Sequence, residues 1–328
     1  MIAITGGGTG GHLVIAKAIK EELNKRGIKP IFIGSTYGQD RNWFEEDDGF
    51  EEKYFFDTSG VVNKSGIKKI LSLSNIIKHS FETKKIFKKH KIKIVFSVGG
   101  YSAAPASFGA IMFKKRLFIH EQNAYMGKLN KLLNPFAKRV FNTFLYNDPY
   151  PVRDEFFKKA RIRKEIKTII FLGGSQGAKA INDFAFEVAK TKKYKIIHQT
   201  GKLDFDRCKK FYQEKHLDVD YFAFNKNIVD KISKADFAIS RAGASSVFEL
   251  SANQIPTLFV PYPYAAGNHQ YYNAKFLVDK KLAFLRVQNE LDLSVFEEIK
   301  NIDIISQKLK EINSENGARI IVDEILKG

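Results

Sequence analysis

A short apolar run, a glycine-rich turn and the start of a helix follow one another at the beginning of the chain. Ile2–Ile4 has strand character, Thr5–His12 reads TGGGTGGH, and Leu13–Ile19 carries apolar residues at helical spacing. This arrangement aims backbone N–H groups and the positive end of a helix dipole at an anion. The glycines of Gly6–Gly11 also satisfy the G-x-G-x-x-G spacing of dinucleotide-binding loops. A phosphate-bearing ligand is therefore the first ligand to consider.

The second half of the chain repeats this unit. Thr168–Leu172 reads as a strand, Gly173–Gly177 as a turn and Ala178–Asn182 as the beginning of a helix. Gly6 and Gly173 stand 167 residues apart, which is close to half of the 328 residues. Two such units, in a chain that is long for a single core, predict an α/β protein with two doubly wound, Rossmann-like domains.

The boundary between the two domains is expected within Asn147–Arg153. This stretch contains two prolines, which prevent a helix there and are typical of a linker. We therefore assign residues 1–152 to an N-terminal domain and residues 153–313 to a C-terminal domain. The tail reads as helical, and we expect its end, about residues 314–328, to pack back on the first domain.

A dinucleotide-binding domain places an acidic residue at the end of its second strand to hold a ribose. The second strand is expected over Pro30–Gly34, and the positions at its end are Gly34 and Ser35. This argues against NAD in the first domain. The next stretch, residues 36–60, reads as polar and irregular.

Polar residues gather where further strands of the first half end. The strand Ile94–Val98 runs into Gly99–Ser102, and the strand Leu117–Ile119 runs into His120–Asn123. Strand ends of this kind face the ligand crevice of an α/β sheet. His12, which closes the first glycine turn, is well suited to move a proton near neutral pH, although a histidine at a helix start is often only a cap or spacer.

The second half offers two helix N-termini preceded by small residues, at Gly173–Ala178 and at Gly243–Ser246. Both suit a diphosphate, whose oxygens accept hydrogen bonds from backbone N–H groups without a metal. Glu249, a turn further on, could accept hydrogen bonds from ribose hydroxyls, or could simply be an acid favoured by the helix dipole. The sequence has no metal-spaced His/Cys cluster and no Walker lysine, so neither a metal nor a cofactor is expected.

The net charge of +18 is unevenly distributed. Residues 61–140 contain 17 Lys and Arg but only two acids, Glu82 and Glu121, and so carry +15 of it. Nucleic acid or an anionic membrane surface would each suit such a segment. The alternative is a lysine-rich composition that charges any solvated face.

Residues 61–91 concentrate this charge, with nine lysines and one acid. An apolar stripe runs between the lysines and consists of Ile67, Ile70, Leu71, Ile76, Ile77 and Phe81. A helix with this pattern could lie on anionic lipid, or it could pack on the sheet with a solvated lysine face. The pattern alone leaves both possibilities open.

Seven motifs along the chain can be compared together: Thr5–His12, Gly99–Ser102, His120–Asn123, Pro151–Arg153, Gly173–Ala178, Arg241–Glu249 and Asn268–Gln270. In residues and in order they resemble the bacterial peptidoglycan N-acetylglucosaminyltransferases of glycosyltransferase family 28. The resemblance runs from Ile2 to about Ala274, and the remaining fifty or so residues carry no motif.

This resemblance implies a GT-B fold, in which the active site lies in a cleft between two Rossmann-like domains. The donor, UDP-N-acetylglucosamine, would lie mainly on the second domain, with Ser175 and Gln176 at the diphosphate and Glu249 at the ribose. By motif position, the residues implied to bind the donor are Thr9, Gly10, Gly11, Asn123, Arg153, Ser175, Gln176, Asn225, Ala244, Ser245, Ser246, Glu249, His269 and Gln270.

The implied reaction is an inverting transfer of N-acetylglucosamine to the 4-hydroxyl of the N-acetylmuramoyl unit of lipid I. The products are lipid II and UDP, in peptidoglycan synthesis and hence in cell shape and division. A general base must accept the proton of the attacking hydroxyl; His12 is the first candidate and Glu121 the second. The glycine loops of the first domain would face the pyrophosphate of the acceptor.

A lipid-linked acceptor implies a peripheral enzyme on the cytoplasmic face of the bacterial inner membrane. Residues 61–91 would then contact the anionic inner leaflet. The single cysteine, Cys208, excludes an intrachain disulfide and favours a reducing compartment, and the N-terminal strand leaves no room for a signal peptide.

Two other functions remain open from the sequence. One is a different GT-B nucleotide-sugar glycosyltransferase, acting on a membrane lipid such as diacylglycerol. The other is a non-enzymatic protein that binds nucleic acid through the basic segment, which would leave the Arg241–Gln270 constellation unexplained. We therefore expect no nucleic-acid partner.

Overall fold

The computed structural model describes residues 1–61, 64–225, 227–312 and 316–327. The chain divides into two compact units, Met1–Val152 with Asn316–Gly328, and Arg153–Glu315. Three sets of positions used above lie outside the described residues: 62–63 in the basic segment, 313–315 around the expected domain end, and 328.

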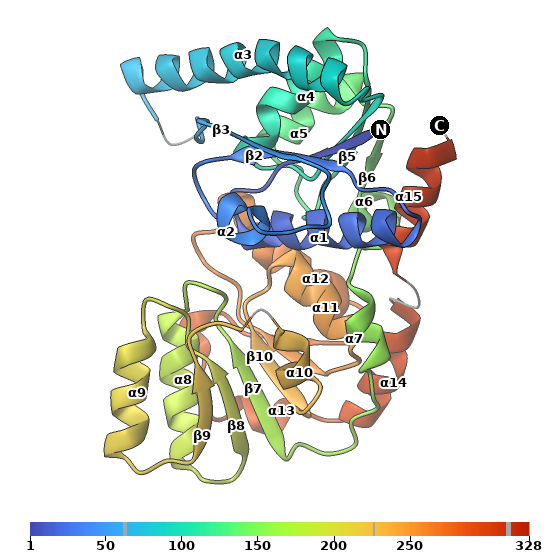
Figure 1. Ribbon diagram of the computed structural model, residues 1–328. Coiled ribbons are helices and arrows are strands. Elements are labelled where there is room, and N and C mark those ends of the chain that lie inside the picture. The colour runs from blue at the N-terminus through green and yellow to red at the C-terminus, as the bar shows by residue number, and fades with distance from the viewer. Residues whose placement is uncertain (62–63, 226, 313–315, 328) are drawn as a thin grey trace. The chain divides into compact units, whose positions relative to one another are not determined.

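A six-stranded parallel sheet forms the centre of the first unit (Figure 1). Its strands are β1 (Ile2–Thr5), β2 (Ile31–Ser35), β3 (Lys53–Phe56), β4 (Ile94–Ser97), β5 (Arg116–His120) and β6 (Arg139–Phe141). Their order is β3-β2-β1-β4-β5-β6, so the winding reverses between β1 and β4. This is the strand order of a Rossmann domain, and ligands bind beside such a reversal.

Helices cover both faces of this sheet, which explains why strands such as β1 are apolar throughout (Figure 1). On one face lie α1 (Gly10–Lys25), α2 (Asp40–Phe44) and α15 (Gly317–Lys327). On the other lie α3 (Gly66–Lys89), α4 (Ala104–Met112) and α5 (Lys128–Leu133). Three short helices complete the unit: η1 (Tyr101–Ala103), η2 (Asn134–Phe136) and α6 (Thr143–Tyr146). The last helix, α15, packs along α1, where the Arg26 guanidinium donates to Asp323 Oδ1 at 2.6 Å.

The second unit has the same construction. Its strands are β7 (Thr168–Leu172), β8 (Lys195–Gln199), β9 (Val219–Phe222), β10 (Phe237–Ser240), β11 (Thr257–Phe259) and β12 (Phe284–Leu285). They form a parallel sheet in the order β12-β11-β10-β7-β8-β9, with the reversal between β7 and β10. Two sheets of this topology confirm the prediction of two doubly wound, Rossmann-like domains.

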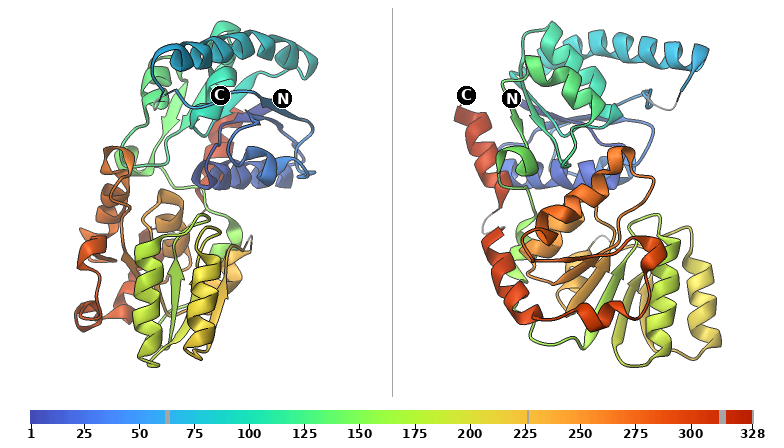
Figure 2. Two further views of the ribbon diagram at one scale, coloured as in Figure 1. Left: turned by 90° about the vertical axis from the view of Figure 1, so that its left-hand side faces the viewer. Right: turned by 180° about the vertical axis from the view of Figure 1, so that it is seen from behind.

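Most helices of the second unit lie in the connections between these strands, as the crossovers of a parallel sheet require, while α7 precedes β7 and η4, α13 and α14 follow β12 (Figure 2). They are α7 (Asp154–Lys158), α8 (Lys179–Lys190), α9 (Phe205–Glu214), α10 (Ile228–Ile232), α11 (Ala244–Ala252), η3 (Ala266–Asn268), α12 (His269–Val278), η4 (Gln288–Glu290), α13 (Val295–Glu298) and α14 (Ile302–Ile312). Helices α8 and α9 bury Ile181, Phe184 and Tyr212 against one face of the sheet.

The strands that the sequence did not reveal are edge strands. The expectation that residues 36–60 are irregular is wrong at Lys53–Phe56, because this segment pairs in parallel with β2. The strands β9 and β12 also lie at sheet edges, and all three are only partly buried. A half-buried edge strand needs no continuous apolar run, so it leaves little pattern in a sequence.

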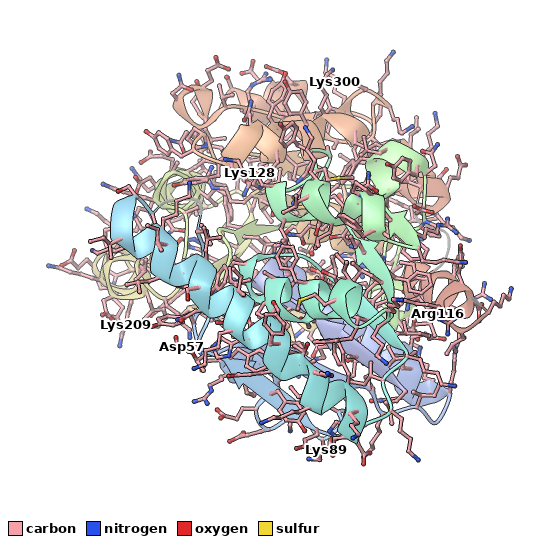
Figure 3. The ribbon with its side chains drawn as sticks, turned by 90° about the horizontal axis from the view of Figure 1, so that it is seen from above. Asp57, Lys89, Arg116, Lys128, Lys209 and Lys300 are labelled. Carbon is pink, nitrogen blue, oxygen red and sulfur yellow. The ribbon has the colours of Figure 1, made fainter. Side chains whose placement is uncertain are left out.

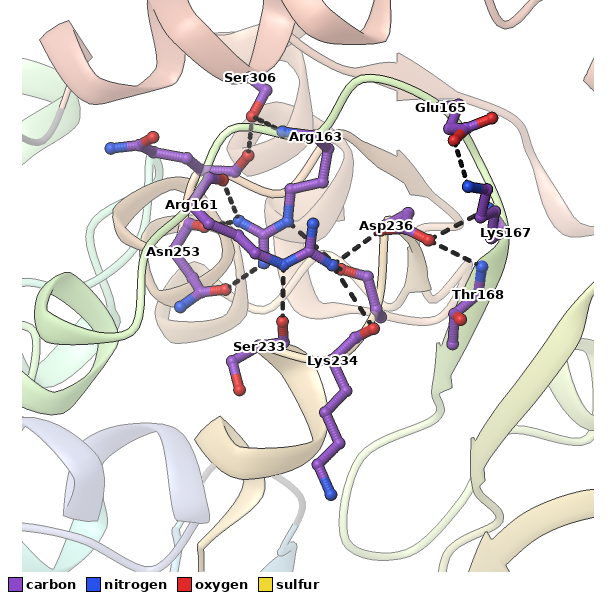
Figure 4. Close-up of polar contacts among 12 residues, drawn as sticks. Arg161, Arg163, Glu165, Lys167, Thr168, Ser233, Lys234, Asp236, Asn253 and Ser306 are labelled. Carbon is purple, nitrogen blue, oxygen red and sulfur yellow. Dashed lines mark hydrogen bonds and ion pairs between the residues drawn. The ribbon is translucent and has the colours of Figure 1, made fainter.

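A buried arginine fastens the start of the second unit to its sheet (Figure 4). Arg163 has no exposed surface, and its guanidinium donates to Asn253 Oδ1 at 2.6 Å and to the Arg161 carbonyl at 2.7 Å. Its backbone N–H donates to Ser306 Oγ at 2.9 Å. These acceptors are uncharged, and burial lowers the pKa of Arg163 to about 9. The segment before β7 is thus tied to the end of α11 and to the middle of α14.

Candidate functional site

In each unit, the residues assigned to the site, apart from Arg153, lie in loops and helices that follow the carboxyl ends of parallel strands. In the first unit, Thr9–His12 follows β1 and Glu121–Asn123 follows β5. In the second, Ser175 and Gln176 follow β7, Asn225 follows β9, Ala244–Glu249 follows β10, and His269 and Gln270 follow β11, while Arg153 precedes α7. This is the sheet edge at which α/β domains bind ligands.

The first glycine turn is locked against the turn that follows β4. Gly6 and Gly8 have φ values of +117° and +78°, which favour glycine. The Gly7 N–H donates to the Gly99 carbonyl at 3.1 Å, and a Cβ on Gly6 would lie 2.4 Å from the same oxygen. The Gly8 N–H donates to Asp40 Oδ1 at 2.5 Å. Two N–H groups of this turn are therefore engaged within the protein and do not face a phosphate.

His12 stands in the first turn of α1 with both ring nitrogens in hydrogen bonds. Its Nδ1 lies 2.9 Å from Thr9 Oγ1, and its Nε2 lies 3.1 Å from Gln122 Nε2. The Gln122 amide is placed with its nitrogen toward Nε2, and in that placement Nε2 of the imidazole accepts while Nδ1 donates to Thr9 Oγ1. A neutral imidazole with an acceptor nitrogen is the form that a general base requires.

Glu121 organises the loop after β5. Its carboxylate accepts hydrogen bonds from the Asn123 N–H at 3.0 Å, the Gly127 N–H at 2.8 Å and Asn130 Nδ2 at 2.9 Å. The residue is buried, and the Asn142 amide donates to its backbone carbonyl at 2.9 Å. Both carboxylate oxygens are therefore committed to holding the loop that carries Asn123.

The glycine turn of the second unit presents its N–H groups differently. The carbonyls of Ser175 and Gln176 accept from the N–H groups of Lys202 and Leu203, at 3.1 Å and 3.4 Å. Gly177 has φ +97°, so the chain turns sharply into α8. Within the described ranges, the N–H groups of Ser175 and Gln176 have no acceptor. Outward-pointing N–H groups before a helix suit an anion.

Side chains of α12 brace the loop before α11. Gln270 Oε1 accepts from the Ala242 N–H at 3.2 Å and from the Tyr262 N–H at 3.0 Å. Asn273 Nδ2 donates to the Ala242 carbonyl at 3.2 Å. The position of Ala244–Ser246 at the start of α11 follows from this bracing, and no sequence pattern indicated the roles of Ala242 and Asn273. The side-chain oxygen of Gln270 is used, so its amide nitrogen is the atom that can donate to a ligand.

Glu249 and Arg153 are oppositely charged residues of the second unit that interact electrostatically. Burial raises the pKa of the Glu249 carboxyl to about 7, and the Arg153 charge opposes this rise. The Arg153 guanidinium lies over the Phe156 ring at 5.1 Å, and its Nη1 is 3.7 Å from Glu155 Oε2. Its buried Nε has no hydrogen-bond partner in the part of the chain that the structure describes.

Asn225 and His269 are held by local turns. Asn225 Oδ1 accepts from the Asn227 N–H at 2.8 Å, and His269 Nδ1 lies 2.9 Å from the Ala266 carbonyl. The carbonyl can only accept, so Nδ1 of His269 is protonated and Nε2 is an acceptor. Each residue keeps one polar atom that its turn does not use.

The two units therefore offer different chemistry. The second unit combines an N–H array, a carboxylate and an arginine, a set that fits a nucleoside diphosphate. The first unit offers an imidazole with polar partners at both ring nitrogens, which fits proton transfer. Among the described residues, no three His, Cys, Asp or Glu side chains are grouped as a metal site would require.

Helix α3 carries an exposed apolar and basic surface, here called the α3 surface, which consists of Ile67, Ile70, Leu71, Ile77 and Phe81 with Lys68, Lys69 and Lys78. All five apolar side chains are more than half exposed. The opposite side of α3 packs on α4, and Ile76, which the sequence pattern placed in the same stripe, is buried there. Figure 3 shows α3 lying across this face of its unit, with Lys89 near its end. In the described ranges, no helix is both long and apolar enough to cross a membrane.

Comparisons with known proteins cover the whole chain. Residues 2–142 match the Glycosyltransferase family 28 N-terminal domain, and residues 168–325 match the Glycosyltransferase family 28 C-terminal domain. A protein of Campylobacter fetus subsp. fetus (strain 82-40) is 54% identical over 100% of both chains. Its name is UDP-N-acetylglucosamine--N-acetylmuramyl-(pentapeptide) pyrophosphoryl-undecaprenol N-acetylglucosamine transferase.

A second relative of the same name, from a Nitratiruptor species, is 52% identical over 99% of this chain and 98% of its own. Among solved structures, the crystal structure of Acinetobacter baumannii MurG is similar, with a TM-score of 0.78 and 26% sequence identity. That likeness covers 100% of this chain and 99% of the other.

Proposed function

The chain belongs to glycosyltransferase family 28, and on that premise we propose that it transfers N-acetylglucosamine from UDP-N-acetylglucosamine to lipid I, giving lipid II and UDP. The observation that carries the proposal is the 54% identity, over the full length of both chains, to a transferase named for this donor and acceptor. The geometry of the two glycine turns supports it, because the N–H groups of Gly7 and Gly8 in the first turn are engaged within the protein, whereas those of Ser175 and Gln176 have no acceptor in the described ranges.

The donor is proposed to bind chiefly to the second unit. The N–H groups of Ser175 and Gln176 and the start of α11, at Ala244–Ser246, would meet the diphosphate. Glu249 would accept hydrogen bonds from the ribose hydroxyls. Arg153 supports this assignment, because its buried Nε lacks a partner among the described residues and a nucleotide oxygen would supply one.

The sugar is proposed to be held by donors and acceptors from both units. In the second unit these are His269 and the side-chain nitrogen Nε2 of Gln270, whose oxygen Oε1 already accepts from Ala242. Asn225 would lie by the nucleotide. In the first unit they are Asn123 and the helix start at Thr9, Gly10 and Gly11.

The reaction is proposed to be a single inverting displacement. The acceptor 4-hydroxyl oxygen forms a bond to the anomeric carbon while the bond from that carbon to the diphosphate oxygen breaks. UDP leaves with the electron pair, and N–H groups at helix starts stabilise the charge that develops on it. The hydroxyl proton passes to the base and then to solvent.

We assign the base to His12 and give Glu121 a supporting role. The imidazole already has an acceptor nitrogen, whose partner is the amide of Gln122, and an acceptor hydroxyl could displace that amide. Both oxygens of Glu121 instead accept hydrogen bonds from its own loop. Using Glu121 as the base would require breaking the loop that carries Asn123.

The α3 surface is proposed to dock on the anionic inner leaflet, so that the enzyme works at the cytoplasmic face of the membrane that holds lipid I. Exposed apolar side chains rimmed by lysines match a lipid interface, because the former enter the headgroup region and the latter attract anionic lipid. The lysines of this surface lie outside the residues assigned to substrates, so docking and turnover can be tested separately.

Two experiments test these proposals. Turnover of UDP-N-acetylglucosamine with a soluble lipid I analogue, compared with diacylglycerol as acceptor, tests the reaction; no turnover of the analogue would reject it. Charge reversal at Lys68, Lys69 and Lys78 should weaken binding to anionic vesicles while leaving that turnover unchanged. The matched control is reversal of three exposed lysines of the second unit, Lys209, Lys210 and Lys215, which changes the net charge equally. Equal loss of vesicle binding in both variants would contradict the docking assignment.

A further inference from the structure

The first residue of α2, Asp40, holds two separate loops of the first unit. Its Oδ1 accepts the Gly8 N–H at 2.5 Å, and its Oδ2 accepts the Ser35 N–H at 2.9 Å. Asp40 has no exposed surface. One carboxylate therefore joins the glycine turn after β1 to the end of β2.

Two glycines, Gly7 and Gly34, leave the space that this carboxylate occupies. A Cβ on Gly7 would lie 2.4 Å from Asp40 Oδ1, and a Cβ on Gly34 would lie 2.8 Å from Oδ2. Any larger residue at either position would displace the side chain. In the described part of the chain Asp40 has no ion pair with a Lys, Arg or His, and burial raises its pKa. An unpaired buried charge is costly, so its presence calls for a role that a neutral side chain could not fill.

The two glycine turns differ at this point. In the second unit the N–H groups of Ser175 and Gln176 have no acceptor, carboxylate or other, among the described residues. In the first unit a carboxylate accepts a turn N–H group, as a phosphate oxygen does in a dinucleotide loop. Asp40 is thus a built-in anion for the first turn.

We propose that Asp40 is a positioning residue for the reaction: its carboxylate fixes Gly8, and through the adjoining Thr9 it fixes the orientation of His12. The path is short, because Thr9 follows Gly8 directly and its Oγ1 lies 2.9 Å from His12 Nδ1. The inference rests on the proposed function, in which His12 accepts the proton. A displacement of about 1 Å at a reacting group can cost on the order of 100-fold in rate, so small movements of this turn matter.

The kinetic test uses Asp40→Asn, which keeps the shape of the side chain but turns one acceptor oxygen into an NH₂ group facing an N–H donor. We expect kcat to fall tenfold or more, and by a larger factor than the KM for UDP-N-acetylglucosamine rises, because Thr9 also belongs to the proposed sugar contacts. The matched control is Asp47→Asn. It removes a carboxylate that accepts the Gly49 N–H at 2.9 Å and pairs with Lys20 Nζ at 2.7 Å, in the same unit but away from the first turn, and it should leave kcat unchanged. Equal losses of kcat in the two variants would overturn the proposal.

A double-mutant cycle with His12→Ala separates positioning from general loosening. If Asp40 acts through His12, Asp40→Asn should lower kcat by less than twofold in the His12→Ala background. A full, additive loss in that background would overturn the proposal.

A measurement that needs no turnover keeps this inference distinct from the proposed reaction. In the wild-type protein, amide hydrogen exchange resolved by NMR should show protected N–H groups at both Gly8 and Ser35. Rapid exchange at Gly8 would overturn the inference even if the enzyme is active or if Asp40→Asn does not fold. Protection at Gly8 together with no turnover of a lipid I analogue would instead reject the proposed function and leave the contact standing.

Discussion

Glu249→Gln should stabilise the folded protein above neutral pH while weakening donor binding. Burial raises the pKa of this carboxyl from 4.5 to about 7, so the folded chain keeps a proton that the unfolded chain loses at lower pH. Stability attributable to Glu249 is therefore full below pH 4.5 and is lost as the pH rises through 7. At about 1.4 kcal/mol per pKa unit, the ionised carboxylate costs about 3 kcal/mol at pH 8. Glutamine has a similar shape and carries no charge, so it avoids this cost.

Urea unfolding followed by far-UV circular dichroism at pH 5 and pH 8 measures the effect. The free energy of unfolding of the variant should exceed that of the wild type by about 3 kcal/mol at pH 8 and by much less at pH 5. The control is Glu187→Gln, because Glu187 is an exposed residue of α8 paired with Lys190. A surface pair of this kind contributes less than about 1 kcal/mol.

The same variant should raise the donor KM while the acceptor KM stays constant, because a carboxylate accepts two hydroxyl hydrogen bonds and an amide oxygen replaces it poorly. Equal stability of variant and wild type at pH 8 would refute the argument from burial. Equal effects on both KM values would remove Glu249 from the ribose.

Three further variants test other parts of the structure. His12→Ala should lower kcat by about 10²–10⁴-fold while UDP binding, measured by calorimetry, persists; an unchanged kcat would end its role as the base. Arg163→Met should lower the free energy of unfolding by about 3 kcal/mol in urea, because it removes the donor of the buried Asn253 Oδ1 and of the Arg161 carbonyl, and an unchanged unfolding midpoint would contradict this. Gly177→Ala should weaken UDP binding roughly tenfold, because a Cβ there would lie 2.5 Å from the Thr200 carbonyl and φ is +97°. Unchanged affinity would show that this turn does not hold the diphosphate.

The parts of the fold that could be predicted are those that residues close together in the sequence determine. The central strands are apolar runs because both their faces are buried, and each glycine turn is followed directly by its helix. Edge strands such as Lys53–Phe56 were not predicted, because they are only partly buried and need no continuous apolar run. The burial of Ile76 was also not predicted, because periodicity identifies a face of a helix but not what covers it.

The site was predictable only where a motif lies within one stretch of chain. Asp40 was missed because it acts on Gly8, 32 residues away, across a strand and a loop. An acid at the end of β2 was considered only as a ribose ligand, and the residues there are Gly34 and Ser35. The acid in this region is Asp40, five residues after Ser35, and its carboxylate accepts hydrogen bonds from N–H groups of the protein. For Gln270 the motif was recognised from the sequence. The hydrogen bonds that its side-chain oxygen accepts from the Ala242 and Tyr262 N–H groups could not be predicted.

The position of α15 has a consequence for how the protein is made. The first unit is discontinuous in sequence, since α15 (Gly317–Lys327) joins it only after the whole of Arg153–Glu315 has been synthesised. During translation α1 therefore leaves the ribosome long before the helix that packs along it. The hydrogen bond from Arg26 to Asp323 can form only after α15 has been synthesised. The second unit can therefore be complete before the amino-terminal unit receives its last helix.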